Sequence, residues 1–148
     1  MIQVATVVGA GLVGGIYAAF SAMIMPALGH LSDEDATAAM VHINRAAERG
    51  PFIMLFGSAT AAAIGLAVTA APRGAVTDLL IAGTSLTSTL VTLAVSVPLN
   101  RRLEREGATF WTVYRRRWTA SNTVRAALAT TAVLTAGTHW LNAPVNTA

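Results

Sequence analysis

The stretch IQVATVVGAGLVGGIYAAFSAMIMPAL (Ile2–Leu28) contains no charged residue, and it decides the class of fold. A helix needs about 20 predominantly apolar residues to cross the hydrocarbon core of a bilayer, and this run exceeds that length. A signal peptide would begin with basic residues and have a shorter apolar core. No Lys or Arg precedes this run. We therefore expect a membrane-spanning helix that stays in the mature protein.

Three further apolar runs follow the first. Hydrophobic residues make up 54% of the 148-residue chain and charged residues only 11%, and the mean hydropathy is +0.58, which is unlike a soluble domain. The sequence predicts an all-α fold, an integral membrane four-helix bundle that forms a single domain over residues 1–148. The predicted spans are residues 2–28, 52–71, 79–99 and 122–141. The absence of Cys excludes disulfides and thiolate chemistry.

The distribution of Arg predicts the orientation in the membrane. The chain has ten basic residues, all Arg. Arg73 lies in the turn after the second run, Arg125 lies inside the fourth, and all the others lie in the connections 29–51 and 99–121. The positive-inside rule then places both connections in the cytoplasm and both termini outside. We expect a multi-pass protein of a bacterial-type cytoplasmic membrane whose Arg residues meet lipid and no nucleic acid.

Both connections show amphipathic patterns. In the first, Ser32 is a candidate N-cap, and apolar residues recur at helical spacing at Ala36, Met40, Ile43 and Ala47. In the second, aromatic residues alternate with arginines over residues 110–118. We expect two interfacial helices, with the arginines of residues 115–117 either facing lipid phosphates or belonging to a site.

Small residues recur every four positions on two of the predicted spans, at Gly11, Gly15 and Ala19 and at Gly57, Ala61 and Gly65. Such stripes let helix backbones approach closely. They predict tight packing within the bundle, and they also offer faces for a homo-oligomer.

Polar residues gather at one predicted membrane depth. Trp118, Asn122 and Arg125 follow one helix face. An ionisable group such as Arg125 within a span indicates a functional site, the alternative being that it reaches out to the headgroups. His42, Asn44 and Arg45 in the first connection and Asn100 after the third span complete the set, and we expect these residues to converge on one pocket.

His42 is the candidate general base of this set, because imidazole titrates near neutral pH. The alternative is a surface or structural histidine. His30 is expected on the same side as His42, with Asp33 and Glu34 nearby, and His139 near the opposite face. No HxxxH or HExxH spacing occurs, so we predict no metal ligands. The glycines of GAGLVGG (residues 9–15) lie within an apolar helix and predict packing instead of phosphate binding.

Several motifs together resemble the anthrone-oxygenase-like family of small four-helix membrane proteins. These are MPAL (residues 25–28), MVHINR (residues 40–45), GPF (residues 50–52), VPLNRRL (residues 97–103) and WTVYRRRWTASNTVR (residues 111–125). The resemblance covers residues 11–134, nearly the whole chain.

The resemblance implies a membrane-embedded oxygenase that oxidises a hydrophobic phenolic or anthrone-type substrate, such as an aromatic polyketide, to a quinone. Dioxygen would be the co-substrate, and no cofactor is expected, although a metal stays open. His42 would act as base, and Arg45 and Arg125 would stabilise the enolate. The substrate-binding residues would be Asn44, Asn100, Trp111, Trp118 and Asn122. The alternative is a scaffold or accessory subunit that binds partner proteins or anionic lipid through its basic cytoplasmic face.

Overall fold

The computed structural model describes residues 1–142, and every regular element within them is helical. The last six residues of the predicted domain 1–148, including the C-terminus whose side of the membrane was predicted, lie outside the described residues. The elements in chain order are α1 (Ile2–Ala19), η1 (Phe20–Ile24), α2 (Met25–Leu28), α3 (Asp33–Arg49), α4 (Pro51–Ala70), η2 (Ala71–Arg73), α5 (Val76–Val91), η3 (Thr92–Ser96), α6 (Val97–Glu106), η4 (Gly107–Phe110) and α7 (Trp111–Leu141).

Three helical stretches are long and apolar enough to cross a membrane: Ile2–Leu28, Pro51–Arg73 and Val76–Leu141. The third stretch reverses direction at Gly107, whose φ of 65° lies in the region that favours glycine. Large apolar side chains such as Met54 and Val68 are exposed on the outside of these helices, which suits a lipid environment.

The second connection differs from its prediction. Residues 99–121 do not form a separate interfacial helix, because α6 continues the preceding helix to Glu106 and α7 runs unbroken from Trp111 to Leu141. The first connection does form its own helix, α3, and Ser32 caps it by accepting a hydrogen bond from the Asp35 backbone N–H at 3.1 Å. Its apolar stripe faces protein: Ala36 and Met40 are fully buried against α6 and α7.

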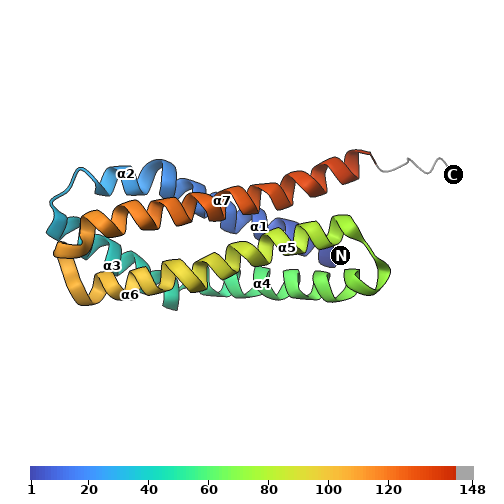
Figure 1. The fold of residues 1–148 in the computed structure, drawn as a ribbon, viewed down its shortest axis with the longest axis horizontal. Helices are drawn as coiled ribbons and strands as arrows, with labels where there is room; N and C mark the ends of the chain where they lie inside the picture. The colour runs from blue at the N-terminus through green and yellow to red at the C-terminus, as the bar shows by residue number, and fades with distance from the viewer. Residues whose placement is uncertain (143–148) are drawn as a thin grey trace.

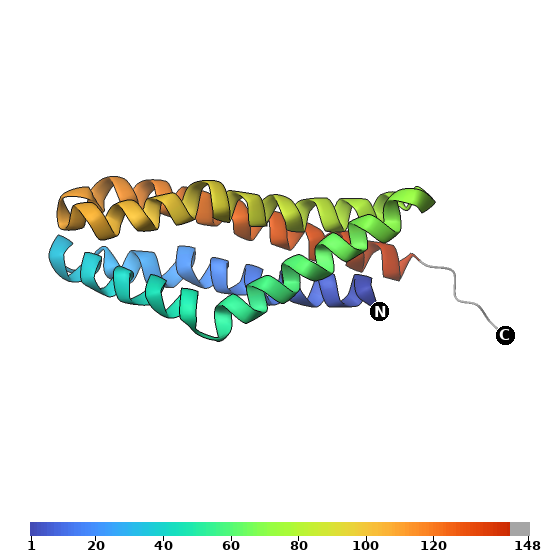
Figure 2. The ribbon, with the colours of Figure 1, turned by 90° about the horizontal axis from the view of Figure 1, so that it is seen from below.

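The elements form an elongated bundle (Figure 1). α1 packs against α4 and α7, and α5 packs against the same two helices. Figure 2 shows α4 crossing obliquely along one half of the bundle, while α3 covers the other half. The break between α3 and α4 at Gly50, where the backbone is extended, therefore lies partway along the bundle (Figure 2).

Close helix contacts use two glycines outside the predicted stripes and one within them, since a Cβ at Gly65 of the second predicted stripe would lie 2.6 Å from the Cδ1 of Ile2. A Cβ at Gly9 would lie 2.8 Å from the Cβ of Ala59, and one at Gly14 would lie 2.7 Å from the Cβ of Ala129. A Cβ at Gly15 would meet nothing within 4 Å. α1 thus approaches α4 and α7 through a face adjacent to the predicted one, and the predicted oligomer faces stay a prediction.

Two π-helical stretches interrupt the long helices. η1 ends just before Pro26 and η3 ends just before Pro98. Proline lacks the N–H that an α-helix would bond to the carbonyl four residues earlier, so a local change of helical winding is expected beside it. π-helical turns are rare and often lie at functional sites.

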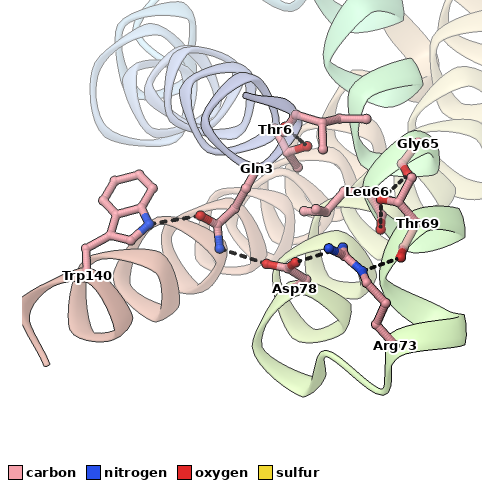
Figure 3. Close-up of polar contacts among 9 residues, drawn as sticks. Gln3, Thr6, Gly65, Leu66, Thr69, Arg73, Asp78 and Trp140 are labelled. Atoms are coloured by element: carbon pink, nitrogen blue, oxygen red, sulfur yellow. Dashed lines mark hydrogen bonds and ion pairs between the residues drawn. The ribbon is translucent and has the colours of Figure 1, made fainter. Parts of the chain in front are cut away.

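A polar network joins the helices at the end of the bundle that holds the N-terminus (Figure 3). Trp140 Nε1 donates to Gln3 Oε1 at 2.9 Å, and Gln3 Nε2 donates to Asp78 Oδ1 at 2.7 Å. Arg73 lies 3.6 Å from Asp78 Oδ2 and donates to the Thr69 carbonyl at 2.7 Å. This network connects α1, α4, α5 and α7 far from the break at Gly50.

Candidate functional site

A cavity of about 340 Å³ lies at the break between α3 and α4. Its walls come from α1, η1, α3, α4, η3, α6 and α7, so both π-helical stretches contribute to it. Most of the lining is apolar, including Phe20, Phe52 and Phe56. Its volume falls within the range of about 300–1,000 Å³ that is usual for small-molecule sites.

Arg125 is the cationic residue of this cavity, and it is almost wholly buried at 4% exposure. Its guanidinium lies 4.2 Å from the ring centre of Tyr17 and 5.4 Å from that of Trp118. It donates from Nη2 to Asn122 Oδ1 at 2.8 Å and from Nη1 to Thr92 Oγ1 at 3.2 Å.

Arg125 forms no ion pair in the described part of the chain, and its buried Nε has no hydrogen-bond partner there. Burying a cation without a counter-charge is costly. The aromatic faces and neutral oxygens offset part of this cost. The arrangement therefore favours an anionic group entering the cavity beside Arg125.

Asn122 is fully buried and positions Arg125. Its Nδ2 donates to the Tyr17 carbonyl at 2.5 Å and to Ser21 Oγ at 2.7 Å, while its Oδ1 accepts from Arg125. These contacts occupy both ends of the amide and attach α7 to α1 beside η1. Sequence reasoning expected Asn122 to bind substrate, whereas in the structure its amide holds the arginine.

A second polar group lies where α3, α6 and α7 meet. Tyr114 donates from its hydroxyl to Asn100 Oδ1 at 2.9 Å, and Asn44 Nδ2 donates to the Tyr114 oxygen at 3.5 Å. Asn44 and Asn100 line the cavity, while Tyr114 lies behind them, fully buried. The sequence pattern placed Tyr114 only among the aromatic residues of an expected interfacial helix over residues 110–118, and did not indicate that it connects two candidate site residues.

The aromatic residues of α7 divide into two roles. Trp118 lines the cavity and packs at 5.5 Å from Phe20 between ring centres. Trp111 stacks on Tyr114 at 5.8 Å within the hydrophobic cluster and does not line the cavity. The expected substrate contact of Trp111 therefore has no cavity beside it.

His42 and Arg45 lie outside the cavity. His42 is exposed, and Arg45 forms an exposed ion pair with Glu104, with its Nε 2.9 Å from Glu104 Oε1. We expected His42 and Arg45 to converge with Arg125 on one pocket, and the structure does not show this. A helix turns about 100° per residue, and the face of α3 that lines the cavity carries Asn44 and Glu48 instead.

Sequence reasoning did not single out Glu48. Its signal was present, since Glu48 follows Asn44 by four residues and so shares its helix face.

Within residues 1–142, no three His, Asp or Glu side chains gather in a way that could hold a metal ion.

Fold and site together define a helical, lipid-compatible protein with a buried arginine at an apolar cavity of small-molecule size. Residues 40–135 match the anthrone oxygenase family. This match covers well over half of the chain and includes the cavity residues of every element except α1 and η1. The chain belongs to the anthrone oxygenase family. Neither the curated proteins nor the solved structures contain a match to it.

Proposed function

We propose that this protein is a membrane-embedded oxygenase that converts a hydrophobic phenolic or anthrone-type substrate to a quinone with dioxygen. The observation that carries the proposal is Arg125, a buried cation that forms no ion pair with any described residue, in the wall of an apolar cavity. Membership of the anthrone oxygenase family supports the same chemistry.

The cavity suits a flat aromatic molecule. Trp118 offers a ring face, and the phenylalanines supply apolar walls. The phenolic oxygen of the substrate would face Arg125, and Asn44 and Asn100 would contact polar atoms at the opposite end of the cavity.

The reaction needs one proton removed from an activated carbon. The electron pair of that C–H bond stays on the substrate as an enolate, whose negative oxygen Arg125 stabilises. A fixed cation is strongly effective in such a water-poor site. The enolate carbon then adds dioxygen, the peroxide takes up a proton, and loss of water yields the quinone carbonyl. One anthrone and one dioxygen thus give one quinone and one water, without a further reductant.

The proposed membrane arrangement has four spans, with α1, α4, α5 and α7 crossing the bilayer. The 31 residues of α7 extend over roughly 46 Å at 1.5 Å per residue, which exceeds a hydrocarbon core of about 30 Å. The end of the bundle with α3 would protrude on the cytoplasmic side, where the exposed arginines lie. The cavity would then sit near the membrane surface.

An apolar substrate would reach the cavity from the lipid. Ile53 on α4 and Leu93 on η3 both line the cavity, yet they are 43% and 56% exposed. The cavity therefore opens to the outside of the bundle between these elements, through side chains that match the acyl chains of the bilayer.

The second candidate function is a scaffold that binds anionic lipid or partner proteins. It is favoured by the exposed arginines of α6 and of the first turns of α7, which are Arg101, Arg102, Arg105, Arg115, Arg116 and Arg117. A scaffold does not require a buried arginine at a cavity, which is why we favour the enzyme.

The test is oxidation of an anthrone by the purified protein in detergent or nanodiscs, measured as dioxygen uptake and quinone formation, with and without chelator. Arg125→Ala should lower turnover by about 100- to 1,000-fold, the typical loss when one electrostatic contact to a developing anion is removed. Arg116→Ala, on the exposed side of the same helix, is the matched control and should keep full turnover. Equal losses in both variants would support the scaffold, and an inactive wild-type protein would refute the oxygenase.

A further inference from the structure

We infer that Glu48 is the general base that takes the proton from the bound substrate. This inference rests on the proposed function, and it replaces His42 in that role. Among the described residues that line the cavity, Glu48 is the only carboxylate. His42 does not line the cavity.

The position of Glu48 follows from the end of α3. Glu48 lies in the last turn of the helix, one turn after Asn44, and the chain breaks at Gly50 directly beyond it. α3 therefore stops beside the cavity, and its final turn presents both side chains to the same space. The neighbouring Arg45 is engaged with Glu104 instead, and no ion pair within residues 1–142 involves Glu48.

Glu48 and Arg125 come from different walls of the cavity, α3 and α7, and are not in ion-pair contact. A base and an enolate-stabilising cation must stay apart in this way, because a direct ion pair between them would neutralise both. The substrate would lie between them, with its acidic C–H bond toward Glu48 and its oxygen toward Arg125.

A second, smaller pocket adjoins this corner of the cavity, between α3 and α6. It has a volume of about 20 Å³, enough for one water molecule, since a water needs roughly 10–15 Å³ of such space. Glu48, Asn44 and Asn100 line both pockets, and the smaller one is otherwise lined mainly by the charged residues Arg45, Arg101 and Glu104. Glu48 thus lies between the apolar cavity and a smaller polar pocket, here called the polar groove, whose charged lining residues are exposed.

The step balances within this arrangement. The C–H bond of the substrate breaks, its electron pair stays on the substrate as the enolate, and the proton goes to the carboxylate of Glu48. Glu48 then releases the proton to water through the polar groove, which restores the base while the enolate remains in the cavity to meet dioxygen.

Proton removal can be measured without oxidation. We would follow hydrogen–deuterium exchange at the methylene carbon of anthrone in D₂O without dioxygen, with the purified full-length protein. General-base catalysis typically contributes about 100- to 10,000-fold. Glu48→Gln should therefore lower protein-catalysed exchange by about 100-fold or more, and Glu48→Asp should retain part of the rate.

The matched control is Glu34→Gln, which removes an exposed carboxylate from the first turn of the same helix and should exchange like wild type. Binding of anthraquinone should be retained in Glu48→Gln, which shows that the cavity is intact.

The outcomes separate the two proposals. Exchange that is equally fast in Glu48→Gln and wild type overturns the role of Glu48, even where wild type oxidises anthrone in air. Glu48-dependent exchange without any oxidation in air supports the role of Glu48 and overturns the oxygenase. A wild-type protein that does not accelerate exchange overturns both.

Discussion

The charge of Arg125 should decide which ligands bind the cavity. Arg125→Met removes the cation but keeps a long, flexible apolar side chain that can fill the space between Tyr17 and Trp118. A hydrogen bond to a charged group contributes about 1.5–3 kcal/mol, which corresponds to roughly 10- to 150-fold in affinity. The variant should therefore bind an ionised hydroxyanthraquinone about 10- to 150-fold more weakly than wild type.

Anthraquinone itself carries no ionisable group, and its affinity should change far less in the same variant. Quenching of tryptophan fluorescence can report both titrations, because Trp118 lines the cavity. The ratio of the two affinities is the decisive quantity. Equal weakening of both ligands would mean that the substitution damages the cavity, and unchanged binding of the ionised ligand would refute the assignment of Arg125 as its partner.

Three further predictions test the architecture. Asn122→Leu removes the hydrogen bonds that this amide makes to the Tyr17 carbonyl and to Arg125 Nη2. Weaker hydrogen bonding of these buried groups costs about 1–3 kcal/mol for each, so the midpoint of thermal unfolding in detergent should fall; an unchanged midpoint contradicts this role. Gly14→Ala would place its Cβ 2.7 Å from the Cβ of Ala129 on α7 and should destabilise the protein by about 1–3 kcal/mol. The control Gly15→Ala meets nothing within 4 Å and should leave the stability unchanged. Equal effects of the two substitutions argue against the close α1–α7 contact. The natural chain has no Cys, so single cysteines at His30 and Val76 can be labelled in oriented vesicles, and labelling from the same side refutes the four-span topology.

Helices and their ends were predictable where the signal is local. The hydrophobicity of residues 2–28 and the cap at Ser32 depend only on neighbours in the chain, and the structure has a helical stretch and a capped helix there. The extent of α7 was not predictable in the same way. The first turns of α7 carry polar side chains on their exposed face, so they do not look like part of a membrane span. On the opposite face, Trp111 and Tyr114 pack against α3 and α6, and this packing stabilises the helix before the predicted span of residues 122–141.

The sequence predicted which residues belong to the candidate site better than it predicted what each of them does. Asn44, Asn100, Trp118, Asn122 and Arg125 were selected by motif and by membrane depth, and the structure brings them to one cavity. The membrane depth of a residue does not specify which face of its helix points toward the cavity. The rotation of α3 about its axis decides that Glu48 lines the cavity and that His42 does not, and this rotation is set by the burial of Ala36 and Met40 against other helices.

The sequence by itself determined that the chain is helical, suited to a bilayer and a member of the anthrone oxygenase family, because length, hydrophobicity and motif are all properties of contiguous residues. Only the tertiary structure decided that Asn122 holds Arg125, that Gly9 and Gly14 form close helix contacts outside the predicted stripes and that Arg45 pairs with Glu104. Each of these depends on how neighbouring helices are rotated and offset. That choice is made by side chains distant in sequence, whose shapes must fit together before any one contact can form.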